Sequence, residues 1–170
     1  GQVSFQQLQQ MLDSAQEIRV DRSTYASFRE DLARSRTLLY LTDNAGEIVF
    51  DRVLAEELQR AYPALSITFC VRGGIAANDA TRADAAEAEL PFPVIDNGNR
   101  VAGTLPELLS EEARSCFESA DIILSKGMGN VETLLGCGKN IYYAFLVKCQ
   151  RFVNLMQKPL MSPMLLHEKQ

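Results

Sequence analysis

Three short polar runs in this sequence contain the residue types that could do chemistry. They are residues 43–47 (Asp-Asn-Ala-Gly-Glu), the pair Asn78-Asp79, and residues 125–130 (Ser-Lys-Gly-Met-Gly-Asn). Each run follows a short apolar stretch that is typical of a buried strand. Ligands of open α/β sheets bind beyond the carboxyl ends of the strands. We therefore predict that the three runs form one site for a metal ion and an anion.

The first two runs offer oxygen donors. Asp43 supplies a carboxylate and Asn44 an amide carbonyl, which are ligands that Mg²⁺ or Mn²⁺ prefers. The pair Asn78-Asp79 follows the next βα unit, so its side chains could converge on the same ion. The alternative is that Asp43 or Asn44, and Asn78 or Asp79, cap the helices that follow them.

The third run is a glycine- and lysine-containing turn suited to an anion. Gly127 and Gly129 flank Met128 and could let backbone N–H groups surround a phosphate, to which Lys126 would add a point charge. The spacing is not that of a Walker A loop. Lys148 ends a further apolar run and could enter the same crevice; the alternative is a lysine that reaches out from the surface.

Neighbouring charged residues could support this site. Glu47 and Asp51 lie four residues apart on one predicted helical face, where either could orient a water ligand, although a solvated first helical turn also explains Asp51. The sequence Arg72-Gly73-Gly74 indicates a flexible cationic turn that could close over an anionic ligand.

Strands and helices alternate from residue 37 onwards. We expect strands at 38–41, 65–71, 93–96, 120–124 and 140–147, and helices at 47–62, 78–90, 105–117, 130–135 and up to 157. In the first of these helices, Val49, Val53, Leu54 and Leu58 are expected to face inward. This order predicts a three-layer, doubly wound α/β fold with a mostly parallel sheet of about five strands and helices on both faces.

The sequence suggests three segments. Residues 1–36 form a short N-terminal helical segment with helices over 4–18 and 21–32, residues 37–158 form the metal- and phosphate-binding α/β domain, and residues 159–170 form a C-terminal tail. Apolar residues in the tail indicate a partner, a missing domain or a homo-oligomer. They are Leu160, Met164, Leu165 and Leu166.

Composition argues against several classes of protein. The formal net charge is −5 and the basic residues are scattered, which disfavours nucleic-acid binding. No apolar run approaches the ~20 residues that span a bilayer, and the amino end lacks the pattern of a signal peptide. The four cysteines form no CxxC pair, so we expect reduced thiols and a cytoplasmic location. His167 is the single histidine, which disfavours histidine-dependent catalysis.

Taken together, the motifs resemble those of the damage-control phosphatase family, whose metal-binding domain is also called acidic-residue-methyltransferase-like. The matching stretches are residues 43–47, 73–81, 125–133 and 145–149. The resemblance implies a phosphomonoester hydrolase that depends on Mn, Mg, Co or Ni and acts on small phosphorylated metabolites, such as sugar phosphates or damaged cofactor precursors.

The resemblance also implies roles for individual residues. Asp43, Asn44 and Asp79 would hold the ion. The phosphate would be bound by Lys126, Gly127, Gly129, Asn130 and Lys148, and Asp43 and Lys126 would be the catalytic residues. Asp43 could instead act as nucleophile or base. Two other classes stay open: a carboxyl methyltransferase that uses S-adenosylmethionine, and a non-catalytic metal- or phosphate-binding module.

Overall fold

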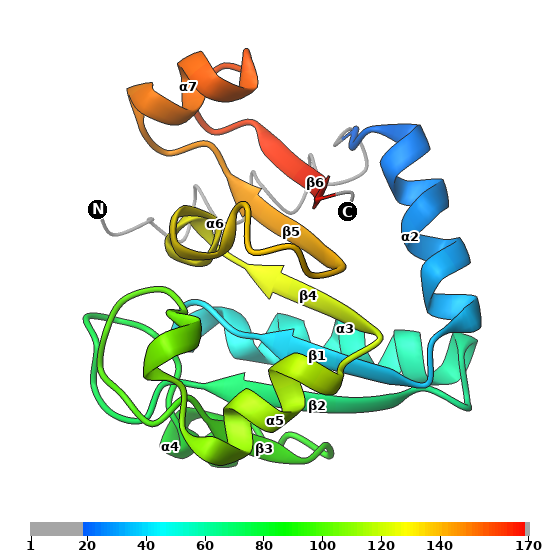
Figure 1. Ribbon diagram of the computed structural model, residues 1–170, viewed down its shortest axis with the longest axis vertical. Helices are drawn as coiled ribbons and strands as arrows, with labels where there is room; N and C mark the ends of the chain where they lie inside the picture. Colours follow the sequence, from blue (N-terminus) through cyan, green and yellow to red (C-terminus); the bar gives the residue numbers. More distant parts are fainter. Residues whose placement is uncertain (1–18, 169–170) are drawn as a thin grey trace.

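A computed structural model of the chain describes residues 19–168. Its centre is one mixed sheet of six strands in the order β3-β2-β1-β4-β5-β6 (Figure 1). The strands are β1 (Thr37–Leu41), β2 (Ser66–Val71), β3 (Val94–Asp96), β4 (Ile122–Lys126), β5 (Ile141–Leu146) and β6 (Pro163–Glu168). The first five are parallel, and β6 runs antiparallel to β5.

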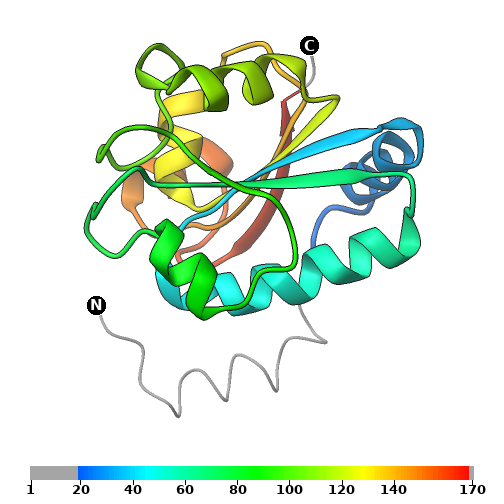
Figure 2. The same cartoon turned by 90° about the horizontal axis from the view of Figure 1, so that it is seen from below.

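Helices cover both faces of the sheet (Figure 2). One face carries α2 (Arg22–Arg34), α3 (Ile48–Ala61) and α4 (Arg82–Glu87), and the other carries α5 (Glu111–Ser119), α6 (Met128–Leu134) and α7 (Gln150–Met156). Two short 3₁₀ turns, η2 (Ala45–Glu47) and η3 (Pro106–Leu108), precede α3 and α5. The predicted three-layer, doubly wound α/β fold is confirmed.

The central strands are apolar throughout because both of their faces are buried. In β1, Leu38 and Tyr40 pack with α2 and α3, whereas Leu39 and Leu41 pack with α5 and α6. This alternation follows from the two-residue period of a strand. The alternation therefore determines on which face of the sheet each side chain at the end of a strand lies.

The sheet has six strands rather than about five, because the chain beyond residue 159 adds β6. Met164, Leu165 and Leu166 pack against the two sheet cores, while Leu160 is exposed. Three of the four apolar tail residues therefore pack within this sheet, and a partner or missing domain for this segment stays a prediction. Homo-oligomerisation and the three segment boundaries stay predictions.

Several helix bounds differ from expectation. The helix over 21–32 is confirmed as α2, and the one expected over 4–18 lies outside the described residues. The helix expected over 78–90 is shorter, because a capping box between Thr81 and Asp84 starts α4 at Arg82. The helix expected over 105–117 is divided, because the Ser110 side chain caps α5.

The inward face of α3 was predicted correctly for Leu58 and wrongly for the other three residues. Val49, Val53 and Leu54 are 40–55% exposed. The buried residues are Ile48, Asp51, Ala55 and Leu58, spaced three or four residues apart on one helical face. Asp51 can lie on this buried face because its carboxylate has hydrogen-bond partners there, which the hydrophobic pattern does not reveal.

The order of the strands reverses between β1 and β4, and the region beyond the carboxyl ends of these two strands is called the crevice below. The chain first builds β2 and β3 on one side of β1 and then returns to place β4 and β5 on its other side. In such sheets the crevice at this reversal is the preferred ligand site. Residues 42–47 after β1 and 127–130 after β4 border it.

Within residues 19–168, none of the helices has the length and apolar character to cross a bilayer.

Candidate active site

The first two βα corners lie side by side. The Ala80 backbone N–H donates to the Asp43 carbonyl at 2.7 Å, and the Ala45 N–H donates to the Asn78 carbonyl at 2.8 Å. An isolated antiparallel bridge joins Asn44 to Asp79. The predicted convergence of these two runs is therefore present in the backbone.

Neither corner uses its polar side chains as helix caps. Asn44 stands at the N-cap of η2 without a side-chain cap bond, and the N-cap of α4 is Thr81. Asn44 instead donates through Nδ2 to Asp43 at 2.8 Å and to Glu47 at 2.9 Å, and its Oδ1 accepts from Asn78. The capping alternative was wrong for both runs, and their side chains are linked to each other.

Gly127 brings the third run against the first. A Cβ at this position would collide with the Asp43 carboxyl group, and the φ angle of Gly127 is +79°, a region that favours glycine. The Gly127 N–H donates to the Ala144 carbonyl at 3.0 Å. Gly127 thus supplies space for the Asp43 carboxylate, while its own N–H is used within the sheet.

Lys126 is the last residue of β4 and extends toward the start of α3. Its Nζ lies 2.7 Å from Asp51 Oδ1 and 3.2 Å from Glu47 Oε2. Although burial acts to lower the pKa of Lys126, these two carboxylates hold it above its usual range. Lys126 is therefore a fixed cation beside the crevice.

Asp51 is buried, which contradicts its reading as a solvated first-turn residue. Its Oδ1 also accepts a hydrogen bond from the Tyr40 hydroxyl at 2.7 Å, and Tyr40 is fully buried in β1. Burial raises the pKa of Asp51, and the Lys126 ammonium opposes that rise. Burial and the Asp51 charge together raise the pKa of Tyr40 well above its usual range, so its hydroxyl stays a donor.

Arg72 is buried and does not belong to a flexible turn, so its predicted role of closing over a ligand was wrong. Its guanidinium donates to Asp79 Oδ2 at 2.6 Å, to Thr104 at 3.2 Å and to Asn130 Oδ1 at 3.1 Å. Arg72 therefore ties β2 to the loop before η3 and to α6. Among the described residues, it is the side chain that holds Asp79 in place, through one carboxylate oxygen.

Asn130 closes the same network. Its amide donates to the Thr42 carbonyl at 3.1 Å and to the Lys126 carbonyl at 2.8 Å, while its oxygen accepts from Arg72 and Thr104. The side chain is fully buried. It fixes the distance between the ends of β1 and β4, which leaves only the backbone N–H of Asn130 for a ligand.

The remaining predicted anion-binding residues lie around the same edge. Lys148 is exposed just after β5. Its positive charge partly opposes the rise in the pKa of Asp43 that is described below. Gly129 stands in the first turn of α6, where backbone N–H groups have no partner within the helix. Gly103 packs against the Gly129 carbonyl, which anchors this turn.

Negative charge at Asp43 is incompletely balanced. Burial, with the charges of Glu47 and Asp79, raises the pKa of Asp43 to about 6, despite the opposing charges of Lys148 and Lys126. In contrast, although burial acts to raise the pKa of Glu47, Lys126 and Asn44 hold it below its usual range. Asp43 is thus a partly buried carboxylate that would gain from an additional cation.

No group of three His, Cys, Asp or Glu side chains within residues 19–168 is arranged to hold a metal ion. The predicted ligand set contains only two such residues, Asp43 and Asp79, with the Asn44 amide as the third donor. Asp79 shares one oxygen with Arg72, and the Asn44 oxygen accepts from Asn78. The donor types suit a hard divalent cation.

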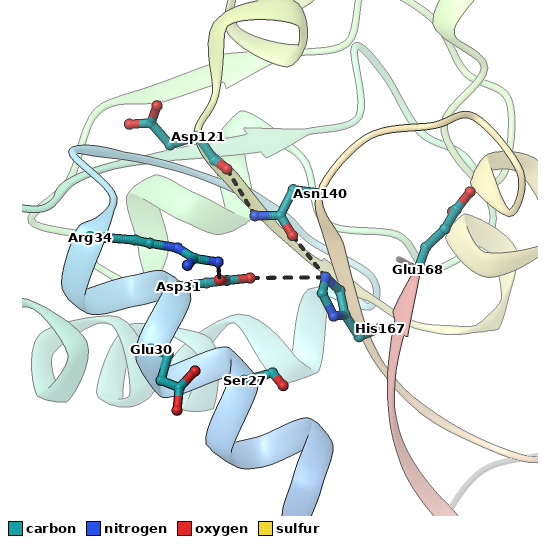
Figure 3. A pocket seen from close by; sticks show the side chains of 8 residues that line it. All are labelled: Ser27, Glu30, Asp31, Arg34, Asp121, Asn140, His167 and Glu168. Atoms are coloured by element: carbon teal, nitrogen blue, oxygen red, sulfur yellow. Dashed lines mark hydrogen bonds and ion pairs between the residues drawn. The ribbon is translucent and has the colours of Figure 1, made fainter. Parts of the chain in front are cut away.

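A polar cavity of about 570 Å³ lies at the opposite, amino end of the parallel strands, between α2 and β6 (Figure 3). Its lining residues are Ser27, Glu30, Asp31, Arg34, Asp121, Asn140, His167 and Glu168. Asp31 pairs with Arg34 and accepts from the Tyr142 hydroxyl at 2.7 Å, and His167 stacks on Tyr142. These contacts attach α2 and β6 to the sheet.

A sheet of this topology, with carboxylates and lysines at its strand reversal, belongs to the doubly wound class of α/β proteins, in which ligands bind beyond the carboxyl ends of the strands. The sequence profile described as "Damage-control phosphatase ARMT1-like domain" matches residues 2–163. The chain belongs to this family.

The chain is similar to three curated proteins of archaea. An uncharacterized protein of Methanocaldococcus jannaschii is 44% identical over 121 residues, covering 68% of this chain and 39% of that protein. A damage-control phosphatase of Pyrococcus horikoshii is 34% identical over 133 residues, covering 76% and 46%. A damage-control phosphatase of Archaeoglobus fulgidus is 39% identical over 120 residues, covering 68% and 41%. The chain therefore spans less than half the length of these relatives.

One solved structure gives the same fold. The crystal structure of a DUF89-family protein from Pyrococcus horikoshii superposes with a TM-score of 0.87 at 28% identity, covering 99% of this chain and 60% of that one. The names of the relatives give no support to the carboxyl methyltransferase alternative.

Proposed function

We propose that this protein is a cytoplasmic, divalent-metal-dependent phosphatase that hydrolyses phosphomonoesters of small metabolites, such as sugar phosphates or damaged cofactor precursors. Membership of the family and two relatives named damage-control phosphatases support the reaction class. The observation that carries the proposal is that the bridge between Asn44 and Asp79 joins the first two polar runs, while Gly127 of the third run lies against the Asp43 carboxyl group.

The donor chemistry of the site fits a metal ion. Asp43 has a raised pKa caused by burial and by neighbouring carboxylates, and Arg72 uses only one oxygen of Asp79 in the described part of the chain. Asp43, Asp79 and the amide of Asn44 would hold Mn²⁺, Mg²⁺, Co²⁺ or Ni²⁺. When bound, such an ion polarises a phosphoryl oxygen and lowers the pKa of a coordinated water.

The residues of the chain would bind and orient the phosphate. Lys126 and Lys148 contribute positive charge, and the N–H groups of Gly129 and Asn130 contribute donors at the first turn of α6. Gly127 keeps the Asp43 carboxylate close to this turn. We assign Asp43 to the metal rather than to nucleophilic attack, because Asn44 and Asp79 alone make a poor metal site.

Turnover of p-nitrophenyl phosphate tests this proposal. The protein is treated with a chelator, and Mn²⁺, Co²⁺, Ni²⁺ or Mg²⁺ is then restored. We expect activity with at least one of these ions and none after Asp43→Ala. The thermal transition of the metal-free variant should stay within a few degrees of the wild type, because the substitution relieves charge crowding.

Asp96→Ala is the matched control. Asp96 ends the neighbouring strand β3, and its carboxylate pairs with Arg82 at the surface. This variant should keep full activity. A wild-type protein that is inactive with all four ions would favour the non-catalytic module, and an Asp43→Ala variant that unfolds would assign Asp43 to folding.

A further inference from the structure

Two carboxylates bind Lys126, and they are not equivalent. Asp51 lies 2.7 Å from Nζ and its side chain is 2% exposed, whereas Glu47 lies 3.2 Å away and is 41% exposed. Glu47 also accepts a hydrogen bond from Asn44. An ion pair is stronger where water is excluded. Asp51 is therefore the partner that fixes the position of the ammonium group.

Tyr40 in turn fixes Asp51. Its hydroxyl donates to the same Oδ1 that binds Lys126, at 2.7 Å. The ring cannot move freely, because it is fully buried and stacks on Phe69 with a centroid separation of 4.5 Å. Tyr40, Asp51 and Lys126 thus form a chain of contacts from the sheet core to the crevice.

The register of the sheet explains why these three groups meet. Tyr40 pairs with Leu124 in the parallel ladder between β1 and β4, so Lys126 lies two residues further along and on the same face. That face is the one covered by α3. Asp51 lies one turn after Glu47 on the inward side of α3, and its carboxylate contacts both Tyr40 and Lys126.

We propose that Asp51, braced by Tyr40, is a positioning residue that holds Lys126 at the crevice and away from the Asp43 carboxylate. The role assigned to Lys126 rests on the proposed function. Lysine is a point charge on a flexible four-carbon stem. Without Asp51, Lys126 keeps only the partly exposed Glu47 as a partner. Its ammonium group is then free to move toward Asp43, where it would compete with a metal ion and leave the phosphate.

The alternative is that the buried ion pair serves only to stabilise the fold. The chain contains a matched group that allows this to be tested. Tyr142 in β5 is also fully buried, and its hydroxyl donates at 2.7 Å to the buried Asp31. The pair lies at the amino end of the strands, beside the cavity in Figure 3. Tyr142→Phe thus removes the same hydrogen bond far from the crevice.

The first experiment measures steady-state kinetics with p-nitrophenyl phosphate and the most effective metal. For Asp51→Asn we expect kcat to fall about 100-fold, the loss that follows a misplaced catalytic group, with little change in KM. Tyr40→Phe should lower kcat about tenfold, the rate equivalent of one lost hydrogen bond. Tyr142→Phe and the surface variant Glu56→Gln on α3 should leave kcat unchanged.

The second experiment does not require activity. A pulse of acetic anhydride labels lysines, and mass spectrometry gives the labelling of Lys126 relative to the exposed Lys148. Loss of the buried carboxylate lowers the pKa of Lys126 and frees its amine, so Asp51→Asn should raise the ratio. Glu56→Gln and Tyr142→Phe should not change it. This measurement remains decisive if the wild type turns out to lack phosphatase activity, which would refute the proposed function alone.

The outcomes separate cleanly. Unchanged kcat and unchanged Lys126 labelling in both Asp51→Asn and Tyr40→Phe would overturn the proposal. An equal loss of kcat in Tyr142→Phe would also overturn it, because the effect would then be one of general stability. Should Asp51→Asn fail to fold, Tyr40→Phe decides the question, since it deletes one oxygen and keeps the ring.

Discussion

The two ends of the sheet each contain a buried tyrosine that donates to a buried aspartate, and the two groups differ in the cation that completes them. At the carboxyl end, Asp51 pairs with Lys126, whose side chain is 18% exposed. At the amino end, Asp31 pairs with Arg34, whose side chain is 75% exposed. Both tyrosine hydroxyls lie 2.7 Å from their carboxylates.

The difference lies in what surrounds each cation. Lys126 is shared between Asp51 and Glu47, and its charge reaches Asp43 across the crevice. Arg34 extends into solvent from the last turn of α2. The same tyrosine–aspartate contact therefore secures a helix to the sheet at one end and holds a lysine beside the crevice at the other. The two cations differ in their exposure.

The largest effect is expected from Lys126→Ala. The variant leaves the Asp51 carboxylate buried with only Tyr40 as partner, so the free energy of unfolding should fall by about 3 kcal/mol near neutral pH. Burial raises the pKa of Asp51 in the folded protein above its pKa in the unfolded chain. The loss of folding free energy in the variant should therefore grow as the pH rises above the pKa of the unfolded chain, and it should shrink in acid, where Asp51 is protonated in both states. Urea denaturation at about pH 5 and about pH 8 measures both quantities. An equal loss at both pH values would contradict this account.

An intermediate effect is expected from pH on metal binding. The Asp43 carboxyl has a pKa of about 6 and must be deprotonated to bind a cation. The affinity for Mn²⁺ should therefore be constant above this pH and fall about tenfold per pH unit below it. Calorimetric titration across this range checks the expectation, with Asp43→Asn as a control that binds no ion. A flat profile would place the ion elsewhere.

The smallest effect is expected from Arg34→Ala. Arg34 is mostly exposed, and exposed ion pairs contribute little, so the free energy of unfolding should change by less than about 1 kcal/mol. Phosphatase activity should be unchanged. A loss as large as that of Lys126→Ala would erase the distinction drawn between the two ends of the sheet.

The fold and the location of the site could be predicted from local sequence patterns. Apolar runs followed by polar residues mark the carboxyl ends of buried strands, and their alternation with helices determines a doubly wound sheet. This was enough to bring Asp43, Asp79 and Lys126 to one edge. The contribution of β6 was missed, because an antiparallel edge strand that follows Pro159 and begins with Pro163 resembles a tail.

The supporting contacts could not be predicted in this way. Asp51 pairs with a lysine 75 positions away, and Arg72 with an asparagine 58 positions away. The prediction from hydrophobic periodicity therefore placed the valines of α3 inward and Asp51 in solvent. For the same reason, Arg72 was predicted to belong to a flexible turn with Gly73 and Gly74, and Asn130 was predicted to bind the ligand. A buried polar residue can be recognised only when its partner is known.

The contact between Gly127 and the Asp43 carboxyl group has a consequence for related sequences. Any larger residue at 127 would displace the acid at 43, so the two positions should vary together although they are distant in the chain. Copies of the domain that retain both residues keep room for an ion beside the glycine turn. Under the proposed function, loss of either residue would mark a copy that keeps the scaffold without the metal site.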